Sequence, residues 1–194
     1  MSVNLTKGQQ ISLSKSDGTE LSAVRMGLGW RAAQRKGFLA KLTGAQDIDL
    51  DASALLVAKG QVADVVFFRH LVSDDGSVRH LGDNLTGGSG AGDDDEVILV
   101  DLARVPAHVD QIVFTVNSFT GQTFAEVQDA FCRLVDERTG QELARYTLSG
   151  GGTHTAQIMA KLHREGNRWQ LKAIGEPAAG QTFQDLLPAI TAHL

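Results

Sequence analysis

The stretch Asp47-Ile48-Asp49-Leu50-Asp51 alternates acidic and aliphatic residues without a break. Successive side chains of a β-strand point to opposite faces, so in a strand the three carboxylates would share one face while Ile48 and Leu50 enter the core. The stretch therefore predicts a strand at the boundary between a hydrophobic core and an acidic surface.

The same period of two recurs along the chain, as is typical of short strands. The further runs are Ile11-Ser12-Leu13, Val24-Arg25-Met26, Val97 to Leu102, Ile112-Val113-Phe114-Thr115-Val116 and Trp169-Gln170-Leu171-Lys172-Ala173. Turn signals separate the runs, at Asp17-Gly18, Lys59-Gly60, Asp75-Gly76, Thr139-Gly140 and Gly166-Asn167. Such turns favour hairpins and hence antiparallel pairing. These strands are too many for one sheet with a wet face, so we expect an all-β fold, a two-sheet antiparallel β-sandwich.

Two segments carry helical signals. Thr155 to Leu162 combines helix-forming residues with an i, i+4 pair of aliphatic side chains, yet it fits a strand equally well. Thr182 to Leu187, just before Pro188, is typical of a short C-terminal helix that covers the core. We therefore expect one or two short helices beside the sheets.

Length and composition restrict the class of protein. With 194 residues and 42% hydrophobic content, the chain can bury one substantial core, and we interpret residues 1–194 as a single domain. A formal net charge of -5 does not supply the positive field that nucleic-acid binding requires. The sequence shows neither a signal-peptide pattern nor the run of about eighteen apolar residues that a membrane span needs. The single cysteine, Cys132, lies in a strand-like run and predicts a buried, inert thiol. We therefore expect a cytoplasmic protein that binds no nucleic acid and does not span the membrane.

A second acidic stretch runs from Asp74 to Asp101, where eight acidic residues face one base, Arg79. Its centre, Gly82 to Glu96, is rich in glycine, which lets backbone carbonyls turn inward beside carboxylates and an Asn amide. Ca²⁺ accepts about six to eight such oxygen atoms in a flexible geometry, whereas Mg²⁺ demands a tighter octahedron. The sequence therefore predicts a Ca²⁺ site shared with the carboxylates of residues 47–51, although those carboxylates fit a solvated strand face equally well.

Other known sites match poorly. An EF-hand loop that starts at Asp47 would need Gly at Ala52 and Glu at Ala58. The six histidines show no spacing typical of a zinc site, and no nucleophile elbow or phosphate-binding loop occurs. We expect His80, which lies close to Asp83 in the chain, to form a hydrogen bond within the acidic loop.

Four motifs, taken together, resemble a known family. They are Gly27-Leu28-Gly29-Trp30, Asp47 to Ser53, Gly82-Asp83-Asn84-Leu85-Thr86-Gly87 and Asp94-Asp95-Glu96-Val97, and the likeness continues through Phe114 to Phe124, Ala130 to Val135 and Glu142 to Tyr146. In this order they are similar to the TerD-like tellurium-resistance and stress-response family of bacteria. The resemblance covers nearly the whole chain and implies a β-sandwich that binds calcium near one end, with no known reaction. We assign the first motif to close packing of the sheet, with Trp30 as its anchor.

The resemblance also implies a set of metal ligands. Carried over by position, they are Asp47, Asp49, Asp51, Asp83, Asn84, Asp93, Asp94, Asp95 and Glu96. The loop from Gly87 to Gly92 lacks the acidic residues that many relatives place there, so we expect one ion rather than two.

These features predict a non-enzymatic, Ca²⁺-dependent interaction module. The ion would order the loop from Gly82 to Glu96 and present it to other proteins of a stress-response complex, including one at a membrane surface. The alternative is a divalent-metal-dependent enzyme in which the same carboxylates hold Mg²⁺ or Mn²⁺ for phosphate or oxyanion chemistry. A third hypothesis is a small-ligand binder at the end of the sandwich, for which the sequence offers no discriminating residue.

Overall fold

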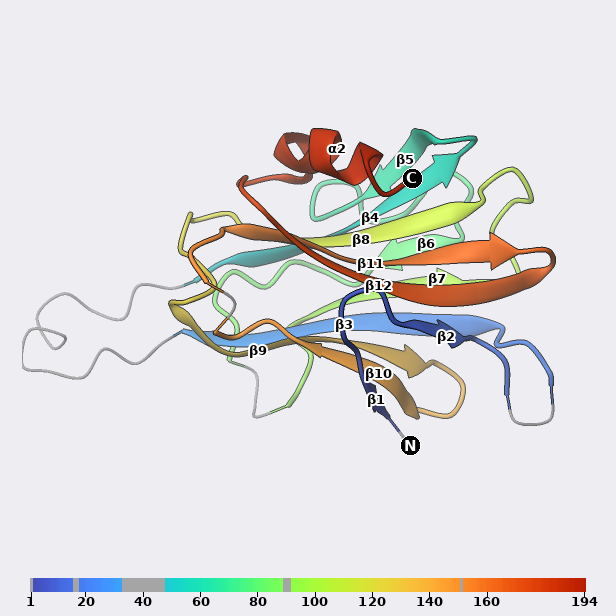
Figure 1. Cartoon of the computed structure of the whole chain (residues 1–194), viewed down its shortest axis with the longest axis horizontal. Coiled ribbons are helices and arrows are strands. Elements are labelled where there is room, and N and C mark those ends of the chain that lie inside the picture. The colour runs from blue at the N-terminus through green and yellow to red at the C-terminus, as the bar shows by residue number, and fades with distance from the viewer. Residues whose placement is uncertain (1, 16–17, 33–47, 89–91, 151) are drawn as a thin grey trace, which may run out of the picture.

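The computed structural model describes residues 2–15, 18–32, 48–88, 92–150 and 152–194, in which it contains twelve β-strands and one α-helix (Figure 1). Sheet A consists, in spatial order, of β1 (Val3–Asn4), β10 (Glu142–Thr147), β9 (Val127–Asp136), β3 (Ala23–Ala32), β7 (Glu96–Asp101) and β6 (Val78–His80). Sheet B consists of β2 (Gln10–Ser12), β12 (Arg168–Ala178), β11 (Ala156–Glu165), β8 (Gln111–Ser118), β4 (Leu50–Ala58) and β5 (Gln61–Val66). All neighbours pair antiparallel except β1 with β10.

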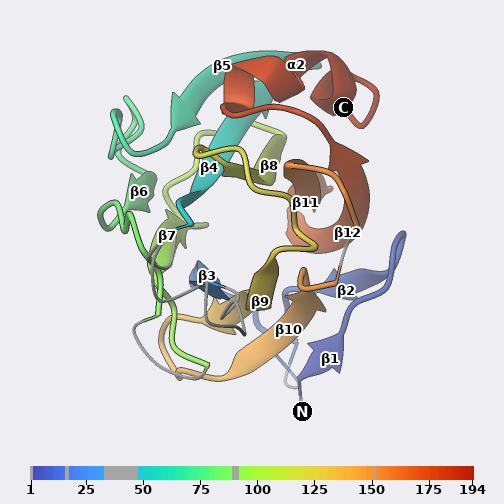
Figure 2. The ribbon, with the colours of Figure 1, turned by 90° about the vertical axis from the view of Figure 1, so that its left-hand side faces the viewer.

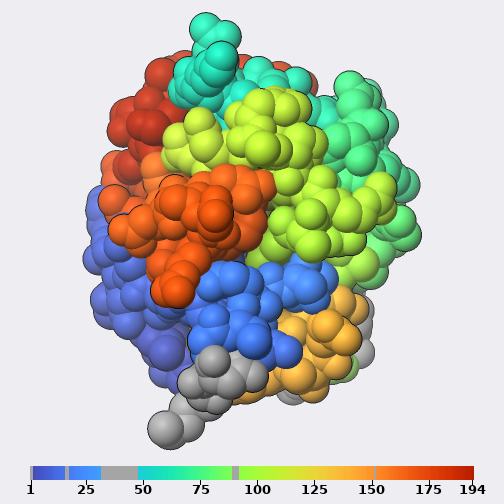
Figure 3. Space-filling view, turned by 90° about the vertical axis from the view of Figure 1, so that its right-hand side faces the viewer, coloured from blue at the N-terminus to red at the C-terminus, as the bar shows by residue number. Residues whose placement is uncertain are grey.

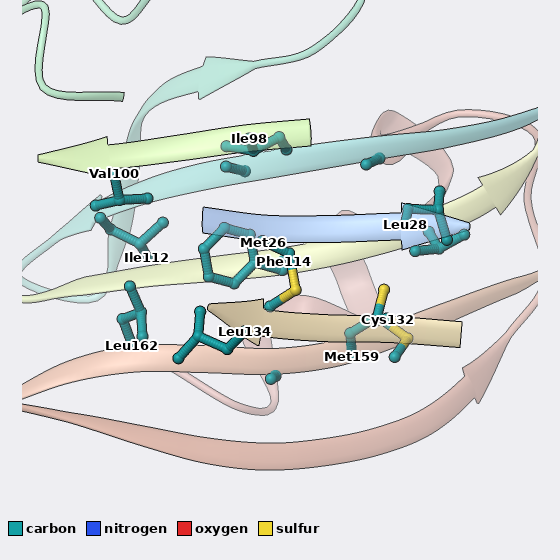
Figure 4. Packing of buried hydrophobic residues seen from close by; sticks show 14 of the residues in the cluster. Met26, Leu28, Ile98, Val100, Ile112, Phe114, Cys132, Leu134, Met159 and Leu162 are labelled. Atoms are coloured by element: carbon teal, nitrogen blue, oxygen red, sulfur yellow. The ribbon is translucent and has the colours of Figure 1, made fainter. Parts of the chain in front are cut away.

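The two sheets pack face to face (Figures 1 and 2), and apolar side chains from both are buried in the layer between them. Figure 4 shows the middle of this core, where side chains of β3, β7 and β9 in sheet A meet those of β8 and β11 in sheet B. Removing such side chains from water is the main stabilising contribution to the fold. The predicted two-sheet antiparallel β-sandwich is therefore confirmed, and so is the buried position of Cys132 within it. At the end of the molecule shown in Figure 3, the turn between β11 and β12 (orange) and the connection between β7 and β8 (yellow-green) close the sandwich.

The C-terminal helix covers the outer face of sheet B. Helix α2 (Phe183–Thr191) packs Leu186 and Ile190 against Leu55 and Val113 of the sheet. The Asp185 carboxylate accepts the backbone N–H of Thr182, a capping contact that fixes the start of the helix. No helix within the described ranges is long and apolar enough to cross a membrane.

Two expectations about local structure need correction or completion. The helix was expected to stop before Pro188, but it continues to Thr191, because packing of Leu186 and Ile190 outweighs the one backbone hydrogen bond that proline removes. The segment from Thr155 to Leu162, which fits a helix and a strand equally well by its sequence, lies from Ala156 onward in the strand β11 (Ala156–Glu165), between β8 and β12.

The acidic-aliphatic stretch joins the sandwich partly as predicted. Asp47 lies outside the described residues, and β4 begins only at Leu50, so Asp49 precedes the strand. Ile48 and Leu50 are buried in the core between the sheets, as the alternation predicted. Asp51 is 3% exposed, so the side chain opposite them is buried as well.

The motif from Gly27 to Trp30 allows close approach of the acidic loop to β3. A Cβ added at Gly27 would overlap the carboxyl group of Asp94, and one at Gly29 would overlap the carbonyl oxygen of Asp93. Trp30 is 2% exposed and its Nε1 donates to the carbonyl oxygen of Ile48 at 2.7 Å. The motif therefore serves the packing role assigned to it, with Trp30 as the anchor.

A double-mutant cycle tests the contact between Gly27 and Asp94. We expect Gly27→Ala to lower the free energy of unfolding by about 1–3 kcal/mol, because the new methyl group displaces the Asp94 side chain. In the Asp94→Ala background the same substitution should cost much less, because the overlapping group is gone. Urea denaturation of the four proteins measures both values, and equal costs in the two backgrounds would contradict this packing.

Candidate metal centre

Three carboxylates converge at the end of the sandwich where β4 begins. Carboxylate oxygen atoms of Asp49, Asp51 and Asp83 all lie within 4.8 Å of one another. Asp49 directly precedes β4 and Asp51 is its second residue, whereas Asp83 comes from the connection between β6 and β7, more than thirty positions further on in the sequence. The structure thus brings together two of the three motifs at the end onto which Figure 2 looks.

Glu96, the first residue of β7, lies beside this group and is 1% exposed. Its Oε2 accepts the backbone N–H of Ala52 at 2.8 Å, and its Oε1 accepts that of Asn84 at 3.2 Å. Strand β5 pairs with β4 only from Ala54 onward, so the edge at Ala52 has no strand partner there. The Glu96 carboxylate satisfies this edge and joins sheet A to sheet B next to Asp51.

His80, the last residue of β6, holds Glu96 from the other side. The Nδ1 atom of His80 accepts the backbone N–H of Gly82 at 3.2 Å, so the ring hydrogen is on Nε2. This Nε2 lies 3.4 Å from Oε2 of Glu96, and both side chains are fully buried. The expected hydrogen bond of His80 within the acidic loop is therefore the one that it accepts from Gly82, while its Nε2 faces the buried Glu96 carboxylate.

Burial and mutual repulsion disfavour the charged forms of these carboxylates. Desolvation, followed by the charges of Asp83 and Glu96, raises the pKa of Asp49 to about 6. Desolvation, followed by the charges of Glu96, Asp49 and Asp83, raises the pKa of Asp51 to about 8. Burial also raises the pKa of Glu96, against the hydrogen bonds that it accepts. A divalent cation among these groups would remove the repulsion and favour the ionised forms.

The donor set fits an oxygen-preferring cation. It consists of carboxylate oxygens from a strand and a loop, and Oδ1 of Asp49 is buried without a hydrogen-bond partner within the described part of the chain. A buried acceptor of this kind is costly unless it is satisfied. Asp49, Asp51 and Asp83 would hold the ion, and Glu96 would lie next to them.

The third acidic motif divides between the site and the scaffold. Asp94 forms an ion pair with Arg133 at 2.7 Å and does not join the other carboxylates. Oδ2 of Asp95 accepts the backbone N–H of Trp30 at 2.9 Å. Both side chains fasten the loop to sheet A, and Glu96 is the residue of this motif that lies beside the candidate centre.

The remaining predicted ligands are placed elsewhere. Oδ1 of Asn84 accepts the backbone N–H groups of Thr86 and Gly87 at 3.1 and 3.0 Å and thereby forms the turn of the loop. Asp93 is exposed, and Asp47 lies outside the described residues.

Asn117 of β8 belongs to this region and was not predicted. It is 1% exposed, lies opposite Asp51 in the pairing of β4 with β8, and donates from Nδ2 to Oδ2 of Asp51 at 3.3 Å. Its position depends on the register between two strands, so the only signal in the sequence is an amide at the end of an alternating run.

A second group that could hold a metal ion consists of Asp64, His70 and Asp74. Both carboxylate oxygens of Asp64 already accept backbone N–H groups, of Val65 at 2.7 Å and of Asp74 at 2.8 Å. The side chain of Asp74 is 92% exposed. The group around Asp51 is therefore the stronger candidate for a metal centre.

A β-sandwich with a buried group of carboxylates at one end defines the class of protein, and comparison with known proteins defines the family. The family model of the TerD domain matches residues 1–189. The tellurium resistance protein TerZ of Serratia marcescens is 48% identical over 186 residues, which cover 95% of this chain and 94% of that protein. The stress response protein SCP2 of Bacillus subtilis (strain 168) is 38% identical, with 96% and 98% covered. The chain belongs to the TerD family.

The fold agrees with a solved structure of the same kind. The crystal structure of a homologue of the telluride resistance protein TerD, from Streptomyces coelicolor A3(2), superimposes with a TM-score of 0.69 over 84% of this chain and 94% of that one. The two sequences are 17% identical, so this likeness concerns the fold alone.

The raised pKa values predict how stability depends on pH. Asp49 and Asp51 have folded-state pKa values of about 6 and about 8, above the value of about 3.9 for an unfolded chain, so the folded protein binds more protons over this interval. In a metal chelator, the free energy of unfolding should therefore fall as the pH rises from about 4 to about 8, by up to about 1.4 kcal/mol per pH unit for each group. Urea denaturation at several pH values measures this slope.

Asp51→Asn is the matched variant, because it removes the group that titrates highest and keeps the shape of the side chain. We expect the variant to lose less stability than the wild type between about pH 6 and pH 8. Parallel curves for the two proteins across that interval would contradict the assignment.

Proposed function

We propose that this chain is a calcium-binding, non-enzymatic protein of tellurium resistance and stress response that acts as a Ca²⁺-dependent interaction module. The convergence of Asp49, Asp51 and Asp83 is the observation that carries the proposal. The names of its relatives, which are tellurium resistance and stress response proteins, support the physiological setting.

The kind of donor favours Ca²⁺ over other divalent ions. The candidate ligands are all carboxylate oxygens, and two of them lie on backbone that is fixed by the sheet while the third lies on a loop. Ca²⁺ accepts irregular arrangements of such ligands, whereas Mg²⁺ needs a near-ideal octahedron. Backbone carbonyls of the loop and water would complete the coordination.

The interaction surface follows from where Asp83 lies. Asp49 and Asp51 are buried, whereas Asp83 is exposed. It lies in the chain between Leu81, which is 55% exposed, and Leu85, which is 59% exposed. An ion that binds all three carboxylates would fix this loop, with its two apolar side chains, against the end of the sandwich. Exposed leucines held in a defined position are suited to a protein partner.

The non-catalytic role belongs to the same proposal. Glu96, the most deeply buried carboxylate beside the centre, is held by two backbone N–H groups and by His80. A side chain restrained in this way supports the structure and is poorly placed to exchange protons with a substrate. Turnover of phosphate esters or reduction of tellurite in the presence of Mg²⁺ or Mn²⁺ would favour the enzymatic alternative.

Thermal unfolding with and without calcium tests the metal centre. At a Ca²⁺ concentration one hundred times the dissociation constant, the wild type should gain about 2.7 kcal/mol over its chelated form. Asp51→Asn and Asp83→Asn should lose most of this gain, because each removes a ligand. Asp94→Asn is the matched control: it also removes a carboxylate from the acidic stretch, but one that pairs with Arg133, so its calcium-dependent gain should persist. No gain in the wild type, or equal loss in all three variants, would refute the site.

Growth on tellurite tests the physiological role. In a bacterial strain made tellurite-sensitive by loss of its own TerD-family genes, the wild-type chain should restore growth at least in part. Asp83→Asn should restore it much less at equal protein level, because the loop is no longer fixed by the ion. Full restoration by Asp83→Asn would separate resistance from calcium binding.

A further inference from the structure

A pocket of about 280 Å³ opens on the outer face of sheet B, next to the start of helix α2. Its walls and floor are formed chiefly by Phe67, Phe68, Phe119, Phe183, Asp51 and Asn117. This face of the sheet points away from the main core: further along β4 and β8 it is apolar and covered by α2, whereas at the pocket it becomes polar.

The floor of the pocket carries two hydrogen-bond acceptors, Oδ1 of Asn117 and the carboxyl group of Asp51, beside the hydroxyl group of Ser53. Asn117 donates from Nδ2 to Oδ2 of Asp51 and to the carbonyl oxygen of Gln181. Its Oδ1 is buried and has no hydrogen-bond partner within the described part of the chain. Because Asn117 is 1% exposed and Asp51 is 3% exposed, bulk water does not satisfy these groups freely. The floor therefore calls for a ligand that donates hydrogen bonds.

The walls are four phenylalanine rings in a chain of edge-to-face contacts. The ring centroid of Phe67 lies 5.4 Å from that of Phe68 and 4.9 Å from that of Phe183. The ring centroid of Phe68 lies 5.9 Å from that of Phe119. The faces of such rings carry negative potential and attract cations. The guanidinium of Arg69, at the rim, already lies 5.2 Å from the ring centroid of Phe68, which shows a cation placed on one of these rings.

We propose that this pocket binds a small organic amine with an apolar or aromatic body. The ammonium group would donate to Oδ1 of Asn117 and pair with the Asp51 carboxylate, and the body would pack on the phenylalanine rings. An anionic ligand would offer no hydrogen to Oδ1 of Asn117 and would place its charge beside the Asp51 carboxyl group, and a neutral ligand would lack the positive charge that pairs with the ionised form of Asp51. The positive charge of Arg69 opposes an ammonium ion only weakly, because Arg69 is exposed and screened by solvent.

This ligand site goes beyond the proposed metal centre, with which it shares Asp51. It needs the carboxylate of Asp51 and the unpartnered oxygen of Asn117 but no metal ion. Titrations in the presence of a chelator therefore test the amine site by itself, and a failure of calcium binding leaves their result unaffected.

The first experiment compares three probes of matched size on the full chain in chelator: 2-phenylethylamine, 2-phenylethanol and phenylacetate. Protein-observed NMR titration should show saturable binding of the amine, with the alcohol and the carboxylate at least about tenfold weaker, because only the amine satisfies both polar groups. Hexylamine and cyclohexylmethylamine test whether the shape of the body matters. If none of the three amines binds, or if the alcohol or the carboxylate binds as tightly as the amine, the proposal is wrong.

The second experiment locates the bound amine with exposure-matched variants. Phe119 is 41% exposed at the pocket and Leu71 is 42% exposed away from its lining, so both can be shortened with little effect on the fold. Phe119→Ala should weaken amine binding several-fold, whereas Leu71→Ala should leave it unchanged, with melting temperatures as the check on folding. Equal effects of the two substitutions would place the amine outside this pocket.

Discussion

The carboxylate of Glu96 spans the gap between the two sheets at the one place where β4 runs beyond its neighbour β5. It accepts the N–H of Ala52 in sheet B while its own backbone belongs to sheet A, and it accepts the N–H of Asn84 from the loop that carries Asp83. Nε2 of the buried His80 side chain lies 3.4 Å from Oε2 of this carboxylate. Because this charge must be buried to join the sheets, the neighbouring carboxylates of Asp49 and Asp51 lie in a field that disfavours their ionisation. The proposed affinity of this end for a cation would therefore follow from the way the sandwich is closed.

The acidic loop serves two purposes with similar residues. Asp94 and Asp95 bind Arg133 and the backbone of Trp30, and they bring the loop so close to β3 that Gly27 has no room for a side chain. Glu96, directly after them, turns into the gap between the sheets. Scaffold contacts on one side of the loop therefore position the carboxylates on its other side, and a dense run of acidic residues contributes fewer candidate ligands than its length implies.

The fold could be predicted from the sequence because alternation is a local property. Ile48 and Leu50 face the core for the reason their spacing indicates, and the turns between strands carry their usual residues. The ambiguity of β11 arose because a central strand, buried on both faces, lacks the polar alternation of an edge.

For the site, the meeting of residues 49–51 with Asp83 could be anticipated, but the hydrogen-bond partner of Asp94 lies 39 positions away in the sequence and that of Asp95 lies 65 positions away. The place of Asn117 depends on strand register. No pattern within a few residues encodes such contacts.

The distribution of sulfur and oxygen in the molecule has a chemical consequence. The sulfur atoms of Met26, Cys132 and Met159 all lie in the layer between the sheets, and burial raises the pKa of the Cys132 thiol well above its usual range (Figure 4). Soft metal ions bind preferentially to thiolates and thioethers, and thiol-reactive oxidants react with thiolates. The groups at the end of the sandwich are carboxylates. The described part of the folded chain therefore offers soft reagents no accessible sulfur. The carboxylates at the end of the sandwich are instead the kind of donor that hard ions prefer.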